Sequence, residues 1–392
     1  MSYIAPLAVY IVWHSDFSLG LKIAHHFYST LCRNSDKPLI RTLGIPVYFR
    51  YKNTDGQQYP LNINFKESEY TAIVPLISSE FVIDKYLPTY LDNLLTDCNL
   101  EKDKRRIFPV ALSEHAFKVT DNFASINFIR IDEGKIASKE EKSKAIYEQI
   151  KSSILHELCR LLMGMKKATE ETETLFFTQP VKLFISHSKH DDSKNKAIKF
   201  RNFINAETQL KTFFDANDIA FGSDFGMEIK KAAKESALVV FQSDSYSDRE
   251  WCRVEVLTAK AEACPIVIVN AIQDGEKRAF PYLGNCPSIR FKGNFQAIID
   301  LTLEQILYRL FTKKNLHSLI EFYKIEPDRI LDTAPELYNF VQLRKLELKN
   351  NRAYALVIYP DPPLGSEEMD MLNELDNDFV FITPILLPSI VF

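Results

Sequence analysis

Residues 241–261, FQSDSYSDREWCRVEVLTAKA, are the stretch from which the fold of this chain is best predicted. They begin in an apolar strand, continue through the polar loop 242–249 and end in a helix, which is the repeating unit of a parallel α/β sheet. In that helix Trp251 and Glu255 are four positions apart, so they lie on one face, one turn apart. Ligands of such sheets bind at the loops that follow the strands. An aromatic ring beside a carboxylate at this place suits a nucleotide, whose ribose the carboxylate can reach.

The alternation of strand and helix continues on both sides of this stretch, and it predicts a domain over residues 181–314. Apolar, β-branched runs predict five strands, at 181–185, 210–215, 238–242, 266–270 and 288–291. Amphipathic runs predict helices at 193–206, 226–236, 250–263 and 295–312. A long loop is expected at 216–225, and the Asp191–Asp192 pair is expected to cap the first helix.

An earlier part of the chain follows the same order and predicts a related domain at residues 1–165. Its strands are expected at 7–12, 45–51, 72–77, 107–112 and 126–131, and its helices at 18–33, at 86–95 and before 165. When the two halves are overlaid, VWHS at Val12 falls on ISHS at Ile185, a spacing of 173 residues (185 minus 12). Ile73 falls on Leu238, a spacing of 165 (238 minus 73). These spacings favour two copies of one fold.

The remaining parts of the chain differ from the two copies. A charged, Thr-rich stretch at 166–180 predicts a linker. Residues 315–392 predict a small α/β extension, with a helix to about 323, strands at 354–359 and 379–382, and a helix at 367–375. Because one strand–helix–strand unit cannot bury both faces of its strands, we expect the extension to pack on a neighbouring domain or subunit.

Composition narrows the functional classes. A length of 392 residues exceeds one ordinary domain. A net charge of -4 and a pI near 6.1 give no reason to expect nucleic acid or an anionic membrane as a partner. The six cysteines form no CxxC pair and have no histidine at zinc-finger spacing, so no metal site is predicted. No apolar run reaches the ~20 residues that cross a bilayer, and we expect a cytoplasmic protein with reduced thiols.

Four segments of the second half occur together in the order typical of one family. They are LFISHSKHDD from Leu183, FFDANDIAFGSDFGMEI from Phe213, VVFQSDSYSDREWCRVEV from Val239 and FPYLGNCPSIRF from Phe280. Over roughly residues 181–312 the chain thereby resembles the Toll/interleukin-1 receptor (TIR) domains of bacteria. The resemblance implies a flavodoxin-like sheet of five parallel strands with helices on both sides.

The resemblance also implies an activity. Many TIR domains cleave NAD+ between nicotinamide and ribose, with a glutamate in the helix after the third strand. That position falls on Glu255, and a fixed carboxylate there can stabilise the positive charge that develops on the ribose. NAD+ is then the substrate, and no other cofactor is expected. By the same resemblance, the substrate pocket is lined by Ser186, His187, Ser188, Asp218, Phe221 and Trp251.

Simpler readings of the same residues remain open. Glu255 is one of several glutamates that a solvated helix face could carry, and Trp251 could be a core residue. In the overlay with a spacing of 165, Glu255 falls on Tyr90 and Trp251 on Tyr86, and Pro88 stands where the helix is expected to start. Since the acid is missing, we expect residues 1–165 to be a degenerate TIR-like copy without catalysis, serving self-assembly, regulation or recognition of a trigger.

The sequence therefore predicts an NAD+ glycohydrolase or cyclase that assembly activates, and the resemblance to stand-alone bacterial TIR proteins suggests anti-phage immunity. Its expected partners are NAD+, other copies of itself through the TIR domains, and other TIR or defence proteins. Two alternatives stay open. One is a non-catalytic tandem TIR scaffold for protein–protein interaction, and the other is a receptor that binds a nucleotide signal without cleaving it.

Overall fold

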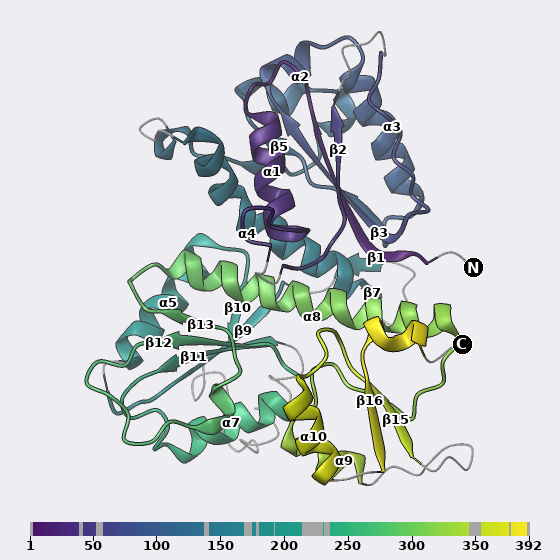
Figure 1. The fold of residues 1–392 in the computed structure, drawn as a ribbon. Helices are drawn as coiled ribbons and strands as arrows, with labels where there is room; N and C mark the ends of the chain where they lie inside the picture. The colour runs from purple at the N-terminus through teal and green to yellow at the C-terminus, as the bar shows by residue number, and fades with distance from the viewer. Residues whose placement is uncertain are drawn as a thin grey trace. The chain divides into compact units, whose positions relative to one another are not determined.

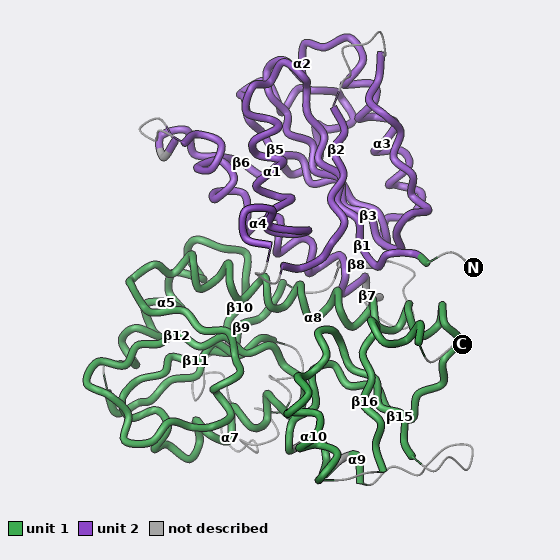
Figure 2. Tube along the Cα trace, in the orientation of Figure 1, with its two compact units in different colours: residues 1–3, 180–392 green, residues 4–179 purple. Residues whose placement is uncertain are grey.

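The computed structural model forms two compact units, residues 4–179 and residues 180–392 together with 1–3 (Figure 2). It describes residues 3–38, 42–51, 58–136, 141–167, 175–177, 180–191, 193–213, 230, 236–344, 354–375 and 378–389. None of the helices in these ranges is both long and apolar enough to cross a membrane.

The first unit is built on a parallel sheet with the strand order β2-β1-β3-β5-β6 (Figure 1). Strand β1, which lies between β2 and β3, reads APLAVYIVW and is buried along almost its whole length, as expected for a parallel strand that is covered on both faces. Pro109, which has no N–H to donate, separates β4 from β5, so the single strand expected at 107–112 is interrupted. The strands are β1 (Ala5–Trp13), β2 (Val47–Tyr51), β3 (Ser68–Ile77), β4 (Arg105–Ile107), β5 (Val110–Ala111) and β6 (Ile129–Arg130).

Helices and short turns complete the first unit. The α-helices are α1 (Gly20–Leu31), α2 (Ser79–Ile83), α3 (Leu87–Leu100) and α4 (Lys142–Met163), and the 3-10 helices are η1 (Glu114–Lys118), η2 (Asp121–Phe123) and η3 (Glu133–Lys135). The stretch expected to be a linker contains part of an antiparallel hairpin of β7 (Met165–Lys167) and β8 (Leu175–Phe177). Pro88 lies in the first turn of α3, where proline costs no helical hydrogen bond, so it does not delay the start of the helix.

The second unit repeats this topology. Its parallel sheet has the order β10-β9-β11-β12-β13, with β9 (Lys182–His187), β10 (Lys211–Phe213), β11 (Ser236–Gln242), β12 (Ile266–Asn270) and β13 (Ser288–Arg290). Its first helices are α5 (Ser193–Glu207), α7 (Glu250–Ala261) and the 3-10 helix η5 (Pro281–Leu283). The predicted fold class, parallel α/β sheets in flavodoxin-like order, is therefore confirmed. The helix expected at 226–236 lies almost entirely outside the described residues, and Ser236 already belongs to β11.

The two faces of β11 pack on different helices because successive side chains in a strand point to opposite faces. Leu238 and Val240 share a buried cluster with Val256 of α7. Phe241, on the other face, lies with its ring centroid 5.5 Å from that of Phe200 in α5. The strand is thus held between α7 and α5, and this fixes where the loop 243–249 leaves the sheet.

The helix expected to end at residue 312 instead continues to Tyr323, so this prediction is wrong. Helix α8 (Phe295–Tyr323) is 29 residues long (Figure 1). It begins at Asn294, whose side-chain oxygen accepts a hydrogen bond from the Ala297 N–H at 3.1 Å. No glycine or proline occurs between 312 and 316, so nothing in the sequence interrupts the helix there. The expected domain boundary at 314 falls inside α8.

The C-terminal extension is a small parallel sheet that α8 covers. Its strands are β14 (Arg329–Ile330), β15 (Ala355–Ile358) and β16 (Phe379–Ile382), and the remaining helices are α9 (Leu337–Leu343), α10 (Ser366–Leu375) and the 3-10 helix η6 (Pro384–Ser389). Leu316 and Ile320 of α8 pack on one face of the sheet with Ile358. Phe340 of α9 packs on the other face with Phe381. A neighbouring domain or subunit was expected to supply this cover, but Leu316, Ile320 and Phe340 all lie within residues 315–392, so the extension covers its sheet with its own residues.

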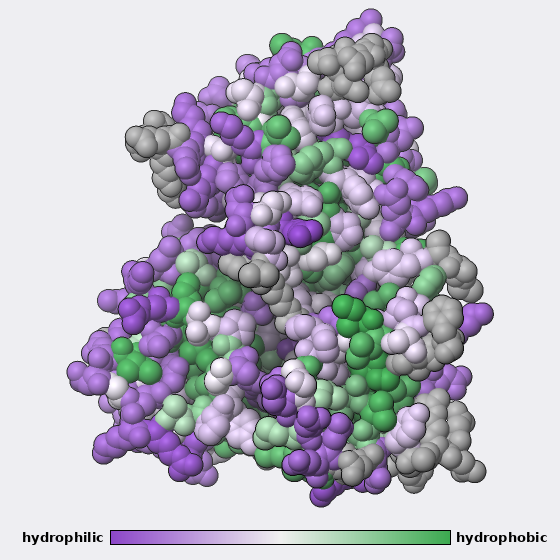
Figure 3. Space-filling view, in the orientation of Figure 1, coloured by the Kyte–Doolittle hydropathy of each residue, from purple (hydrophilic) through white to green (hydrophobic). Residues whose placement is uncertain are grey.

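Hydrophobic side chains also reach the surface of this extension. In the view of Figure 3 they gather over the small sheet. Ile385 and Leu386 of η6 are among the exposed large hydrophobic residues of the chain.

Candidate active site

The candidate site lies at the carboxyl ends of β9 and β11, where the loops that start at Ser188 and Ser243 begin. Glu255 lies on the second turn of α7, and only 4% of its surface is exposed. The hydroxyl of Ser186, the fifth residue of β9, donates a hydrogen bond to Oε2 of Glu255. A buried carboxylate needs such donors, because burial without them costs free energy. Glu255 is thus oriented by the neighbouring strand.

A second hydroxyl extends this hydrogen bond into a chain. The oxygens of Ser186 and Tyr246 are 2.6 Å apart, and Tyr246 is the donor when the Ser186 proton is directed at Glu255. Burial raises the pKa of Tyr246 well above its usual value, and the neighbouring Cys252 and Glu255 act in the same direction. Tyr246 therefore keeps its proton at neutral pH and serves as a fixed donor.

Trp251 and His187 have contrasting environments. Trp251 is 55% exposed at the start of α7, so the reading of this tryptophan as a core residue does not hold. His187 is buried at the end of β9, and its carbonyl accepts a hydrogen bond from the Cys252 thiol at 3.6 Å. The indole is thus more than half exposed one turn before Glu255, while the carbonyl of His187 helps to fasten α7 to β9.

The loop after β9 is tied to the loop after β11 by hydroxyl groups. The oxygens of Ser188 and Ser245 are 2.7 Å apart. Ser188 is buried and its hydroxyl also accepts the His190 N–H at 3.3 Å. Two of the predicted site residues, Asp218 and Phe221, lie outside the described residues. Of the remaining predicted residues, the structure brings Ser186 into contact with Glu255.

Asp191 was expected only to cap a helix, and it also joins the two loops. One of its oxygens accepts the Ser193 N–H at 2.9 Å, as a helix cap does. The other accepts the hydroxyls of Ser243, at 2.6 Å, and Ser245. Partial burial alone would raise the pKa of Asp191, but the hydrogen bonds from these three serines outweigh it and hold the pKa well below its ordinary value. Sequence spacing gives no signal for a contact over more than 50 residues.

Two further carboxylates tie the loop 243–249 to the loop after β12. Asp244 accepts the backbone N–H groups of residues 273, 274 and 275 at 2.9, 3.2 and 3.3 Å, and the first two of these lead the effects that lower its pKa. Glu276 accepts hydrogen bonds from the Gln242 amide and the Ser247 hydroxyl, each at 2.6 Å. The loops after β9, β11 and β12 are therefore held in one arrangement by hydrogen bonds.

The strand pairing identifies the residue of the first unit that corresponds to Glu255 more exactly than the sequence overlay did. Val12 pairs with Pro75, whereas its counterpart Ile185 pairs with Val239. The spacing at the third strand is thus 164 residues (239 minus 75), one less than in the overlay. Glu255 then falls on Leu91, next to Tyr90, and both of these residues are buried in α3. Neither is acidic.

In the parts of the chain that the structure describes, side chains that could bind a metal ion do not cluster. There, no group of three or more His, Cys, Asp or Glu side chains is placed to hold a metal ion.

Comparison with known protein families identifies the part of the chain that contains the candidate site. The family model for the TIR domain matches residues 183–304, so these residues are a TIR domain. No curated protein matches the chain.

The similarity of this chain to solved structures is weaker. TIR domains in the structure of the activated Roq1 resistosome, which directly recognises the pathogen effector XopQ, are 20% identical, with 33% of this chain and 83% of that chain covered and a TM-score of 0.21. A putative sugar binding protein from Salmonella typhimurium LT2 is 11% identical, with 60% and 86% covered and a TM-score of 0.19. With TM-scores this low, neither structure says anything about the function of this chain.

Proposed function

We propose, from the premise that residues 183–304 are a TIR domain, that this chain cleaves the bond between nicotinamide and ribose in NAD+. The observation that supports this most directly is the buried carboxylate of Glu255, oriented by Ser186 at the carboxyl edge of the sheet. A carboxylate held in a fixed position stabilises a cation better than one that must first be oriented.

In the proposed reaction the C–N bond between ribose and nicotinamide breaks, and its electron pair goes to the ring nitrogen, so nicotinamide leaves as a neutral molecule. The ribose becomes an oxocarbenium ion, which Glu255 stabilises. Water, or a nucleophilic group of the substrate itself, then attacks the sugar cation, and the proton it carries is lost to solvent. The first route gives ADP-ribose and the second a cyclic product. The exposed ring of Trp251 supplies a surface on which a base can stack.

Access to Glu255 suggests how the activity is controlled. With 4% of Glu255 exposed, ribose can reach the carboxylate only after residues around it move. We therefore expect an enzyme that is slow as a single chain and is activated when copies assemble through their TIR domains. A role in bacterial anti-phage immunity, with other defence proteins as partners, fits such a switch and rests on resemblance to bacterial TIR proteins.

A non-catalytic scaffold is the second candidate, and one observation favours it. An exposed tryptophan is unusual on a free surface and common at protein interfaces, and Trp251 is 55% exposed. In that case the same surface would bind another TIR domain, and Glu255 would only support the fold.

Chromatography of the products after incubation with NAD+ separates these candidates. The protein is assayed over a range of concentrations, because assembly is expected to raise the rate. Glu255→Gln, which keeps the shape and removes the charge, is expected to lower nicotinamide release at least about 100-fold. Glu250→Gln, an exposed glutamate at the start of the same helix, is the matched control and is expected to act as the wild type. Release by Glu255→Gln at the wild-type rate would refute the proposal.

A further inference from the structure

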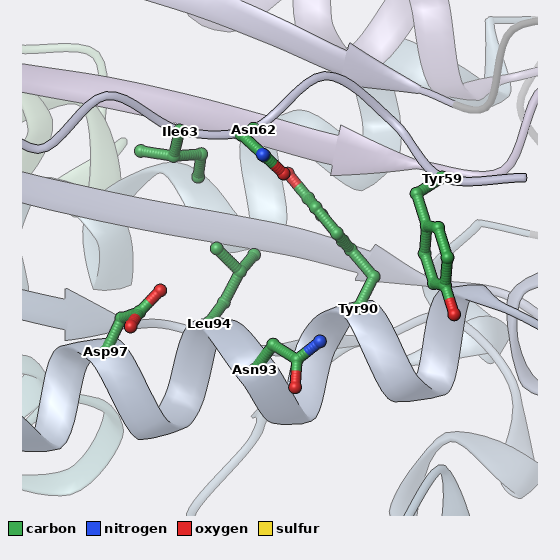
Figure 4. A pocket seen from close by; sticks show the side chains of 7 residues that line it. All are labelled: Tyr59, Asn62, Ile63, Tyr90, Asn93, Leu94 and Asp97. Atoms are coloured by element: carbon green, nitrogen blue, oxygen red, sulfur yellow. The ribbon is translucent and has the colours of Figure 1, made fainter. Parts of the chain in front are cut away.

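The first unit contains a cavity of about 340 Å³ between helix α3 and the chain that leads from β2 to β3 (Figure 4). Ligand pockets commonly measure ~300–1,000 Å³, so a small molecule can fit. Tyr90, Asn93, Leu94 and Asp97 line it from one face of α3, as their spacing of three, four and seven residues requires. Tyr59 and Asn62 line it from the opposite side.

The aromatic walls of this cavity are held in place by the fold. The hydroxyl of Tyr90 donates a hydrogen bond to the carbonyl of Leu61 at 3.0 Å, which fastens the β2–β3 connection to the helix. The ring of Tyr59 lies 5.4 Å from that of Tyr86, edge to face, while 38% of Tyr59 stays exposed. An exposed ring in a fixed orientation can stack on a flat ligand with little loss of side-chain entropy.

The polar groups of the cavity indicate what kind of ligand it takes. The side chains of Asn62, Asn93 and Asp97 form no hydrogen bond or ion pair with other described residues, so all three are available to a ligand. An amide presents a donor and an acceptor side by side, which matches the edge of a nucleobase. Asp97 is the one charged side chain among the lining residues, so the lining disfavours a phosphate group; the nearby Arg105 is turned to the carbonyl of Asp97, to which it donates a hydrogen bond at 3.4 Å.

We propose that this cavity binds a nucleoside, that is, a base with its ribose and without phosphate, and does not cleave it. Two connections line the cavity: the one between the second and third strands, and the helix after the third strand. These are the connections that carry Phe221 and Glu255 in the second unit. Tyr90 and Leu91 stand where an acid would be needed for cleavage. The first unit then acts as a nucleoside receptor, whether or not the second unit cleaves NAD+.

Titration calorimetry on the full chain tests this with the four common ribonucleosides and AMP as probes. At least one nucleoside is expected to bind at one site per chain, and adenosine is expected to bind at least about tenfold more tightly than AMP. Asn93→Leu is expected to weaken nucleoside binding about tenfold or more, the effect of losing a paired amide contact to a base. Asn99→Leu, an exposed asparagine of the same helix outside the cavity, is the matched control and is expected to change binding less than twofold.

Two more variants make the site and the ligand class testable. Asp97→Asn removes the negative charge and is expected to bring the affinity for AMP closer to that for adenosine. Trp251→Ala alters only the second unit and is expected to leave nucleoside binding unchanged. The proposal is overturned if no nucleoside binds, if AMP binds as tightly as adenosine, if Asn93→Leu behaves like Asn99→Leu, or if Trp251→Ala abolishes binding.

Discussion

At the scale of single residues, the candidate site depends on how a buried carboxylate is kept in place. Glu255 receives the Ser186 hydroxyl, and Ser186 lies next to the hydroxyl of Tyr246. A hydrogen bond to a charged group contributes more than one between neutral groups, about 1.5–3 kcal/mol. The Ser186 hydroxyl, held by its contact with Tyr246, therefore favours one direction of the Glu255 carboxylate.

Removing the Ser186 hydroxyl should show how much of the rate depends on the orientation of Glu255 and how much depends on its charge. Ser186→Ala keeps the carboxylate of Glu255 and removes a donor to it, so we expect nicotinamide release to fall roughly tenfold, less than for Glu255→Gln. Initial rates with saturating NAD+ measure the effect. Ser288→Ala, at an exposed position in β13, is the control. Equal rates for Ser186→Ala and the wild type would show that orientation by Ser186 does not matter.

Asp191 predicts a dependence of stability on pH. Its pKa is lower in the folded chain than the value of about 4 expected when unfolded, so the stability that it contributes is fully present above that pH. It is lost as the pH falls below about 4 and the folded carboxylate takes up its proton. Asp191→Asn removes this contribution, so the difference in unfolding midpoint between wild type and variant should be large at pH 7 and shrink below pH 4. Urea titrations at pH 7, 5 and 3.5 measure it, and a constant difference would contradict the assignment.

The sequence could predict individual site residues better than their contacts. Trp251 and Glu255 are four residues apart on one helix, so their common face follows from helical geometry. The contact between Ser186 and Glu255 spans 69 residues and depends on how β9 and β11 pair. The roles of Asp191 and Tyr246 depend on where the loop 243–249 lies in space, and no local pattern encodes that position.

At the scale of elements, helix α7 is fixed at both ends. Its first half carries Glu255, and near its end Lys260 forms an ion pair with Glu336 at 2.9 Å, with 8% and 19% of the two side chains exposed. Both residues also bond to Asn285. Glu336 belongs to the C-terminal extension, so the extension holds the helix that carries the proposed catalytic carboxylate.

Breaking this ion pair should be costly because the partner left behind is largely buried. Lys260→Met is expected to lower the free energy of unfolding by about 3 kcal/mol, at the lower end of the range for buried pairs. Lys313→Met breaks the pair with Asp332, in which half of the lysine is exposed, and should cost less than about 1 kcal/mol. Urea unfolding of both variants measures the difference, and similar midpoints would show that Lys260 is not held as described.

Most elements could be predicted from local pattern, and the exceptions have physical reasons. The strands at 266–270 and 379–382 match their predicted ranges because short apolar runs define them, the first between Pro265 and Asn270 and the second between Asp378 and Thr383. Strand β14 has two residues, too few for any periodicity to appear. The length of α8 was underestimated because its buried side changes from one sheet to the other along its length, and this hides a single amphipathic pattern.

At the scale of the whole molecule, two units with one topology have different residues at the corresponding place. The second unit has Glu255 in the helix after the third strand, and the first has Tyr90 and Leu91. Both units bury their own cores, with Phe81 and Leu91 in one and Val240 and Val256 in the other. Fold and catalysis are thus encoded by separate residues, and the fold can persist where the acid is missing.

Expressing the first unit by itself should show that it lacks the activity proposed for the second unit. Residues 4–179 alone are expected to release no nicotinamide from NAD+ at any protein concentration, because their helix α3 has no acid at the required place. Chromatography measures release, circular dichroism checks that the fragment is folded, and the full chain is the positive control. Turnover by the folded fragment would show that the first unit is a second enzyme.

Helix α8 limits how this protein can be recombined with others. At 1.5 Å per residue its 29 residues extend about 43 Å, so a single rigid rod supports the TIR sheet at one end and the small sheet at the other. The match to the family ends at residue 304, inside that helix. A chimaera joined there would cut α8 in two, because Leu316 and Ile320 would stay with the small sheet while the first ten residues of the helix would leave with the TIR sheet. The part of this chain that can be moved into another protein as one unit is therefore the TIR domain together with the whole of α8 and the small sheet.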